Sequence, residues 1–288
     1  MNESQGHSLA GETHFRGWAK PGPVPPGLES GVRAEAGESL DAISGHFRLL
    51  QLTKGHRFST DDILTAWYGT SWCPTASRVL DLGSGVGTVG MIAAWRLPGA
   101  QFVTVEAQAE SVALARRSAL YNGLASRYEI RLGDFRDAGV LRPEESFDLV
   151  LGSPPYFPLG TGVLGDHPQK VACRFEVRGD VRDYCRVAAR HLARGGFFAL
   201  VFPTAPEELK RVVDAATEAD LALVRRRSVV FREGEAPLIG LFGLMRREDL
   251  PEAVQGQTWV EPDLVIRNRN GDIHPEYSAV KLAIGFPP

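Results

Sequence analysis

Two short segments of the sequence combine residue types that could bind a ligand and do chemistry on it. Residues 81–90 have the sequence DLGSGVGTVG, and residues 153–157 have the sequence SPPYF. Glycines let a backbone turn sharply and approach a ligand closely. Consecutive prolines stiffen a backbone and remove its amide hydrogens, which leaves carbonyl oxygens as acceptors. The first segment therefore predicts a cradle for a nucleotide-like ligand, and the second predicts a site for a planar group that carries an amine.

The glycine segment fits two cofactor patterns. Gly85, Gly87 and Gly90 have the G-x-G-x-x-G spacing of dinucleotide-binding turns. The D-x-G-x-G-x-G spacing that begins at Asp81 is instead typical of turns that bind S-adenosylmethionine. The Asp81 carboxylate would repel the pyrophosphate of NAD, whereas it suits the ammonium group of a methionine moiety. The residues favour S-adenosylmethionine and leave an NAD-dependent oxidoreductase as a poorer alternative. By itself the glycine spacing is also compatible with an ordinary strand-to-helix turn.

Acidic residues stand at the ends of three successive predicted strands. Asp81 ends the first strand, Glu106 ends the second, and Asp134 follows the third with Phe135 beside it. Glu106 could bind both ribose hydroxyls of a nucleoside, while Asp134 could accept from an adenine amino group next to the Phe135 ring. Each acid alone could be a solvated strand end, but the three together fit a nucleoside-shaped ligand better.

The elements that must position these residues alternate between strands and helices. Apolar runs predict strands at residues 78–82, 101–106, 128–132, 147–151, 197–202, 223–230 and 238–244, and helical periodicity predicts helices at residues 89–95, 110–121, 181–192 and 206–219. A further helix is expected to begin at Ser59, because Asp62 completes a capping box. Such alternation indicates parallel strands with right-handed crossovers. We expect an α/β, Rossmann-like fold with a mostly parallel seven-stranded sheet and helices on both faces.

The segments outside this alternation suggest three regions. Residues 1–38 are rich in proline and glycine and poor in aliphatic side chains, which predicts a disordered arm. The main domain, residues 39–250, is expected to open with a small hairpin formed by residues 47–52 and 57–58. Residues 251–288 are expected to be an extension that completes the same domain.

The composition excludes several classes of protein. With 43% hydrophobic and 23% charged residues in a chain of 288, the sequence is typical of a soluble globular protein. Its longest apolar run, residues 197–202, is far shorter than the roughly 20 residues of a membrane span. The three cysteines (Cys73, Cys173 and Cys185) do not have the number or spacing of a disulfide framework or a zinc site. We therefore expect a cytoplasmic protein without membrane or metal partners.

The same two segments resemble those of a known family. Together they are similar to the cofactor loop and the (Asn/Asp/Ser)-Pro-Pro-Tyr motif of amino-group methyltransferases, and most similar to the bacterial tRNA(Val) adenine-N6 methyltransferases, which modify the base beside the anticodon. The likeness extends from Leu40 to Ala283 and includes residues 54–61, 174–176 and 267–277. The sequence departs from the family at two positions, because the family usually has Asn in place of Ser153 and His in place of Phe175.

The resemblance implies a class I S-adenosylmethionine-dependent methyltransferase fold and methyl transfer to the exocyclic N6 amine of an adenine in tRNA. The implied catalytic residues are Ser153, Pro154, Pro155 and Tyr156. The Ser153 hydroxyl and the Pro154 carbonyl could each accept one amine hydrogen and so aim the nitrogen lone pair at the methyl group. The ring of Tyr156 or Phe157 could stack on the base.

The resemblance also implies two sets of binding residues. The cofactor set is Ser59, Thr60, Asp81, Gly83, Gly85, Gly87, Glu106, Asp134 and Phe135, and the substrate set is Lys54, Arg57, Phe58, Phe157 and Arg174. Because the net charge is only -3, tRNA would have to be held by local basic residues such as these.

Other acceptors and roles stay open at this stage. The acceptor could instead be cytosine N4 in DNA, where Ser-Pro-Pro-Tyr motifs are familiar, or a protein glutamine. The Ser153 departure also admits a cofactor-binding or RNA-binding protein without turnover.

Overall fold

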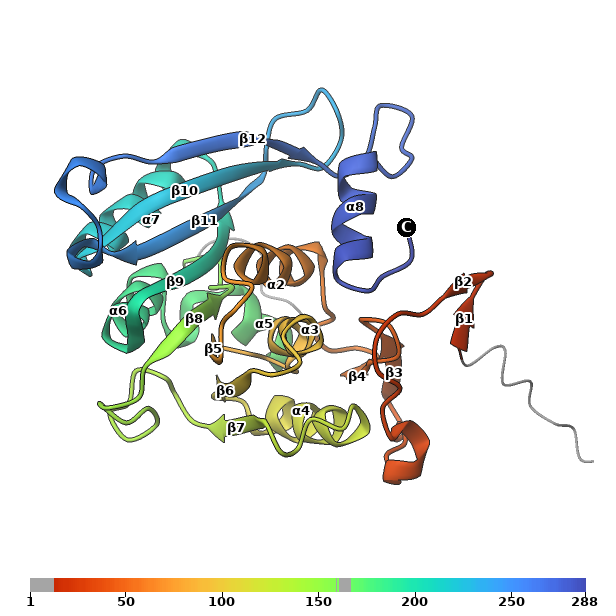
Figure 1. Ribbon diagram of the computed structural model, residues 1–288. Coiled ribbons are helices and arrows are strands. Elements are labelled where there is room, and N and C mark those ends of the chain that lie inside the picture. Colours follow the sequence, from red (N-terminus) through yellow and green to blue (C-terminus); the bar gives the residue numbers. More distant parts are fainter. Residues whose placement is uncertain (1–12, 159, 161–166) are drawn as a thin grey trace, which may run out of the picture.

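The computed structural model describes residues 13–158, 160 and 167–288, and its centre is an eight-stranded sheet (Figure 1). The order of the strands across the sheet is β12-β10-β11-β9-β8-β5-β6-β7. Their bounds are β5 (Arg78–Leu82), β6 (Gln101–Glu106), β7 (Tyr128–Leu132), β8 (Phe147–Gly152), β9 (Leu192–Pro203), β10 (Leu221–Val230), β11 (Ile239–Arg246) and β12 (Trp259–Val265). β11 runs antiparallel to both of its neighbours, and the other pairings are parallel.

The mostly parallel α/β fold is confirmed, but the expected number of seven strands is wrong. The eighth strand is β12, which pairs in parallel with β10 at the edge of the sheet. Its sequence contains Pro262 and several exposed positions, so it has neither the apolar run nor the alternation that marks a strand. Proline is tolerated on an edge strand because its missing amide faces away from the ladder.

Helices cover both faces of the sheet, as the alternation of elements predicts (Figure 1). One face is covered by α2 (Thr60–Trp72), α3 (Thr88–Arg96), α4 (Ala109–Tyr121) and α8 (Pro275–Ala283), and the other by α6 (Val181–His191) and α7 (Pro206–Glu218). The central strand β8 contributes to both cores, because Leu149 and Leu151 pack on the first side and Val150 on the second. This alternation follows from the two-residue period of a strand.

The N-terminal hairpin differs from the expected one. β4 (Arg48–Leu52) pairs with the preceding β3 (Glu38–Ala42), so the expected partner at residues 57–58 is wrong. The amide of Phe58 donates instead to the Gln51 side chain at 2.8 Å. The amide of His56 donates at 2.9 Å to the side chain of Gln169, which lies in the short helix α5 (Pro168–Arg174). Side-chain acceptors thus replace a ladder partner for this segment.

The expected disordered arm is only partly within the described residues. Residues 1–12 lie outside them, whereas residues 13–38 form β1 (His14–Phe15), β2 (Trp18–Ala19) and η1 (Gly27–Ser30) before β3 begins. This described part differs from the expectation, because Val32 is buried and Arg117 of α4 holds the segment by polar contacts. Its guanidinium donates to the Glu38 carboxylate at 2.7 Å and to the Arg33 carbonyl. A count of aliphatic side chains does not detect such charge-assisted contacts.

We expect Arg117→Ala to lower the free energy of unfolding by about 1 to 2 kcal/mol, because it removes hydrogen bonds to a carboxylate and a carbonyl. Thermal unfolding followed by circular dichroism would measure the change. The matched control is Arg116→Ala, since Arg116 is exposed on the same helix and makes a single 3.2 Å contact to the Ile130 carbonyl. Equal melting temperatures for the two variants would contradict a holding role for Arg117.

Candidate functional site

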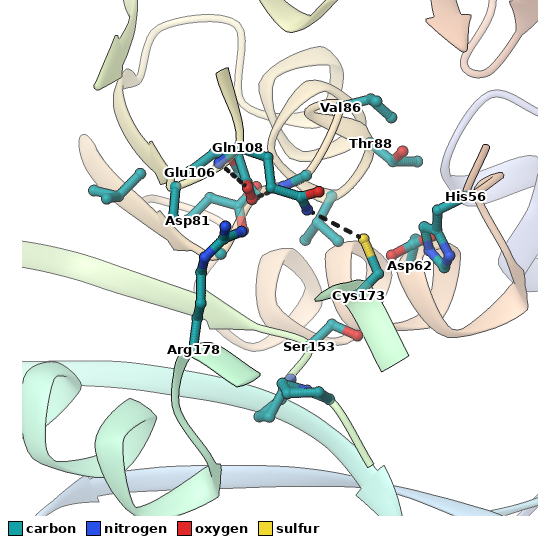
Figure 2. A pocket seen from close by; sticks show the side chains of 18 of the residues that line it. His56, Asp62, Asp81, Val86, Thr88, Glu106, Gln108, Ser153, Cys173 and Arg178 are labelled. Carbon is teal, nitrogen blue, oxygen red and sulfur yellow. Dashed lines mark hydrogen bonds between the residues drawn. The ribbon is translucent and has the colours of Figure 1, made fainter. Parts of the chain in front are cut away.

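A cavity of about 370 Å³ lies where the carboxyl ends of β5, β6, β7 and β8 meet (Figure 2). Each strand end supplies part of its wall: Asp81 and residues 83–86 at the end of β5, residues 105–108 at the end of β6, residues 133–135 after β7 and residues 153–157 after β8. The two segments singled out by the sequence therefore face one cavity. They meet because the carboxyl ends of parallel strands share one edge of a sheet, where ligands bind in open α/β folds.

The glycine loop has a backbone that other residues would not adopt without strain. Gly83, Gly85 and Gly87 have φ angles of +64°, +55° and +92°. A Cβ atom at Gly83 would collide with the hydroxyl of Tyr184, and one at Gly90 would collide with the hydroxyl of Tyr128. The glycines thus serve both the left-handed turns and the close packing of two tyrosines under the loop.

Two buried carboxylates hold this loop by its amides. Asp81 is 1% exposed and accepts a hydrogen bond from the Gly90 amide at 2.9 Å, near the start of α3. Glu106 accepts from the Gly85 amide at 2.9 Å and from the Gln108 amide at 2.6 Å. Amides in the first turn of a helix have no partner within the helix, so a carboxylate is favourable there. The expected strand-end acids are therefore structural acceptors as well as cavity walls.

The electrostatics of the cavity favour a cationic ligand. Burial raises the pKa of Asp81 to about 8, and repulsion by Asp62 and Glu106 acts in the same direction. Burial also raises the pKa of Asp62 to about 7, and that of Glu106 above its usual value. A positive group in the cavity would relieve this repulsion and favour the charged carboxylates. The residues therefore fit a ligand with an ammonium group and ribose hydroxyls.

Asp62 also confirms the expected start of α2. Its carboxylate accepts from the amide of Ser59 at 2.9 Å, as one half of a capping box. Figure 2 shows Asp62 and Ser153 facing the cavity from different elements. The cap therefore brings the beginning of α2 into the wall of the site.

Asp134 and Phe135, which follow β7, form another part of the wall. The Asp134 carboxylate pairs with the Arg136 guanidinium at 2.6 Å, and this hydrogen bond holds the pKa of Asp134 below its usual value. Phe135 is 7% exposed, and its ring packs edge-on against Tyr184 with centroids 4.7 Å apart. Asp134, the expected acceptor for an adenine amino group, thus already has a cationic partner. Phe135, expected beside the adenine ring, is a buried part of the wall.

The Ser-Pro-Pro-Tyr segment forms the remaining side of the cavity. Ser153 and Tyr156 are half-buried and the two prolines between them are buried. The Tyr156 phenol donates to the Asp61 carboxylate at 2.7 Å, and its ring packs edge-on against Phe202. Phe157 is 46% exposed, and its amide donates to the Arg174 carbonyl at 3.1 Å. After β8, the segment is therefore held by α2 through Tyr156 and by α5 through Phe157.

Most of the expected site residues line this cavity, but some do not. The expected residues outside its wall are Lys54, Arg57, Phe58, Thr60 and Gly87. Arg57 pairs with Asp41 of β3 at 2.8 Å, and the Phe58 ring packs against Phe286. Gly87 precedes α3 as its N-cap. These residues shape or flank the site rather than face its interior.

Several wall residues were not expected from the sequence. They include Asp61, Gln108, Cys173 and Tyr184. Gln108 and Cys173 lie side by side, with the amide nitrogen 3.7 Å from the sulfur (Figure 2). Cys173 and Tyr184 follow β8 by more than twenty residues, so no local motif signals their approach to the glycine loop. Asp61 could have been noticed, because it stands beside the Asp62 cap.

Arg174 and Arg178 are exposed and line the same cavity as the glycine loop and residues 153–157. Figure 2 shows Arg178 next to Glu106, and its charge lowers the pKa of that carboxyl against the larger effect of burial.

In the residues that the structure describes, no helix is long and apolar enough to cross a membrane. No group of three or more His, Cys, Asp or Glu side chains in that part of the chain is arranged to hold a metal ion.

Comparisons with known proteins identify the family of this chain. The family model described as methyltransferase small domain matches residues 67–171. A tRNA1(Val) (adenine(37)-N6)-methyltransferase of Shewanella amazonensis is 30% identical over 231 residues, covering 80% of this chain and 90% of that protein. One of Tolumonas auensis is 31% identical over 226 residues, covering 78% of this chain and 87% of that protein.

Solved structures support the fold. A crystal structure of a predicted O-methyltransferase from Agrobacterium tumefaciens has a TM-score of 0.57 and 19% identity, covering 79% of this chain and 98% of that chain. The Rossmann-like class I methyltransferase fold is therefore confirmed. S-adenosylmethionine is the cofactor that goes with this family of domains, and the acidic cavity fits its ammonium and ribose groups.

The raised carboxyl pKa values predict that binding of S-adenosylhomocysteine strengthens with pH. Its ammonium group favours the ionised form of Asp81, whose pKa without ligand is about 8, so binding should release a proton. Between about pH 6 and pH 7.5 the affinity should rise, by at most about tenfold per pH unit. Calorimetric titration across this range would measure it.

The control variant is Asp81→Asn, which keeps an oxygen acceptor for the Gly90 amide but cannot ionise. This variant should bind S-adenosylhomocysteine more weakly than the wild type, and its affinity should depend less on pH. Without ligand, the wild-type free energy of unfolding should fall as pH rises from about 4 to about 8, because the folded pKa of Asp81 lies above its ordinary value. A pH-independent affinity in the wild type would contradict this account of the cavity.

Proposed function

Because the chain belongs to the family of tRNA1(Val) (adenine(37)-N6)-methyltransferases, we propose that its substrate is adenine 37 of a valine tRNA. The reaction is methyl transfer from S-adenosylmethionine to the exocyclic N6 amine of that adenine. We also propose a cytoplasmic location, since tRNA is the substrate.

The observation that carries this proposal is the shared cavity of Ser153 and the buried acids. Ser153 and Pro154 follow β8 directly and stand on the same cavity as Asp81 and Glu106. An exocyclic base amine is a poor nucleophile, because its lone pair is delocalised into the ring. The Ser153 hydroxyl and the Pro154 carbonyl can each accept one amine hydrogen, which frees the lone pair for attack. The bound cofactor supplies a methyl group made electrophilic by its sulfonium.

We assign the cofactor side of the cavity to the acids and the glycine loop. Asp81 and Asp62 would bind the ammonium group, whose positive charge would favour their ionised forms against the effect of burial. Glu106 holds Gly85 and Gln108 and has lone pairs left for the ribose hydroxyls. Phe135 and Tyr184 would form the apolar wall for the adenine ring.

We assign the tRNA side to the exposed rim. Phe157 offers a half-exposed ring for stacking, and Arg174 and Arg178 offer cations for the backbone. Two further expected tRNA contacts differ in their surroundings. Lys54 is exposed, whereas Arg57 already pairs with Asp41. Arg57 should therefore contribute less to tRNA binding than Arg174. The relatives' names favour adenine in tRNA over cytosine in DNA or a protein glutamine.

The decisive experiment is methyl transfer from labelled S-adenosylmethionine to valine tRNA, followed by nucleoside mass spectrometry. We expect N6-methyladenosine, and its absence from a tRNA whose position 37 has been changed to guanosine. Ser153→Ala should slow transfer by roughly 10- to 100-fold, the effect of one lost hydrogen bond in the transition state. Its affinity for S-adenosylhomocysteine should stay unchanged. Formation of N4-methylcytosine, or of no methylated nucleoside, would overturn the proposed substrate.

A further inference from the structure

Arg211 of α7 does not line the cavity, yet its contacts lead back to it. Its guanidinium donates to the Glu208 carboxylate at 2.8 Å, within the same helix, and to the Glu176 carboxylate of η2 (Glu176–Arg178). The guanidinium also lies over the ring of Phe202, 5.2 Å from the ring centroid. Because Phe202 belongs to β9 and is fully buried, the core of the protein fixes the position of this cation.

Glu176 connects Arg211 to the residue that follows the Ser-Pro-Pro-Tyr motif. The Glu176 amide donates to the Phe157 carbonyl at 2.9 Å, and the Phe157 amide donates to the Arg174 carbonyl at 3.1 Å. These two hydrogen bonds form an isolated parallel bridge between Phe157 and Phe175, outside any strand. Two backbone hydrogen bonds alone stabilise such a bridge only slightly. A further contact is therefore needed to hold Phe157 in one place.

The ion pair between Arg211 and Glu176 supplies that contact. The two side chains are 20% and 13% exposed, so the pair is mostly shielded from water. A shielded pair resists separation more than an exposed one, because separation leaves a charge without a partner where water screens it poorly. Phe202, which lies under the guanidinium, also packs edge-on against Tyr156, with ring centroids 5.6 Å apart. The same part of the core thus supports both Tyr156 and Phe157.

We propose that Arg211 is a positioning residue for the acceptor side of the site. Through its ion pair with Glu176, it holds Phe157 where that ring can stack on the target adenine. This proposal rests on the proposed function and adds to it a residue of α7 that does not touch the cavity. Because the ion pair acts on the acceptor side, its loss should affect the use of tRNA and leave cofactor binding unchanged.

The test replaces each acidic partner of Arg211 in turn. Glu176→Gln removes the charge that faces Arg211 but leaves the guanidinium paired with Glu208. We expect it to lower kcat/KM for valine tRNA by roughly 10-fold, within the range that one stacked base contributes. Glu208→Gln is the matched control, because it removes an equal charge from the same guanidinium and leaves the pair with Glu176. The control should lower kcat/KM by less than about twofold, the effect of a pair within one helix.

A double-mutant cycle tests whether the ion pair acts through Phe157. In a Phe157→Ala background there is no ring to position, so Glu176→Gln should then cost less than about threefold. Arg211→Met keeps an apolar stem over Phe202 without a charge. It should reproduce the loss caused by Glu176→Gln, and the two changes together should cost no more than either alone. Thermal unfolding and affinity for S-adenosylhomocysteine are measured for every variant.

Several outcomes would overturn the proposal. One is an unchanged kcat/KM in Glu176→Gln or an equal loss in Glu208→Gln, since the ion pair would then serve only the stability of α7. A loss that persists undiminished in the Phe157→Ala background would place its effect elsewhere. Loss of S-adenosylhomocysteine binding in Glu176→Gln would mean that the pair supports the whole fold. Failure of the wild type to form N6-methyladenosine would instead remove the proposed function, and this inference with it.

Discussion

The hydrogen bonds from the glycine-loop amides to Asp81 and Glu106 are the contacts on which the rest of the site depends. Asp81 reaches from the end of β5 to the Gly90 amide, and Glu106 reaches from the end of β6 to the Gly85 amide. Each carboxylate therefore joins a rigid strand to a loop that glycines alone would leave loose. With the loop fixed, the start of α3 and the two strand ends form one wall of the cavity.

This arrangement places negative charge where burial makes it unfavourable. Burial raises the pKa values of Asp62, Asp81 and Glu106, and repulsion by the other two carboxylates adds to this effect at Asp81. A ligand with phosphates would add to this repulsion, whereas a ligand with an ammonium and a sulfonium relieves it. The same physical fact thus explains why a loop that also fits the dinucleotide spacing belongs to a methyltransferase. A cationic ligand favours the ionised carboxylates, which is why its binding is expected to be coupled to proton release.

The acceptor side of the cavity is built on a different principle, the placement of lone pairs. The two prolines donate no hydrogen, and they carry the backbone from β8 past the cavity between Ser153 and Tyr156. Tyr156 is fixed by Asp61 from α2, an element far from it in the chain. Phe157 is fixed by backbone pairing with residues 174–176. Preorganisation of this kind lets positioning and electrostatics do the work without a covalent intermediate.

Local sequence determined the parts of this protein whose signals are local. The apolar runs and helical periodicity located β5 to β8 and the helices α3, α4, α6 and α7, and the glycine and Ser-Pro-Pro-Tyr motifs located both sides of the site. Because the carboxyl ends of parallel strands share an edge, their meeting in one cavity also followed from the sequence. The Ser59–Asp62 cap was visible for the same reason, since capping involves residues three positions apart.

Tertiary structure decided everything that depends on partners distant in the chain. β4 pairs with β3 rather than with residues 57–58, because the Phe58 and His56 amides find side-chain acceptors in Gln51 and Gln169. β12 is a strand only because β10 offers it an edge. The Arg57 guanidinium pairs with Asp41, so its charge is already partnered. Asp61 meets Tyr156 across the fold. Residue types and spacing reveal which groups could interact, but only packing decides which acceptor each donor reaches.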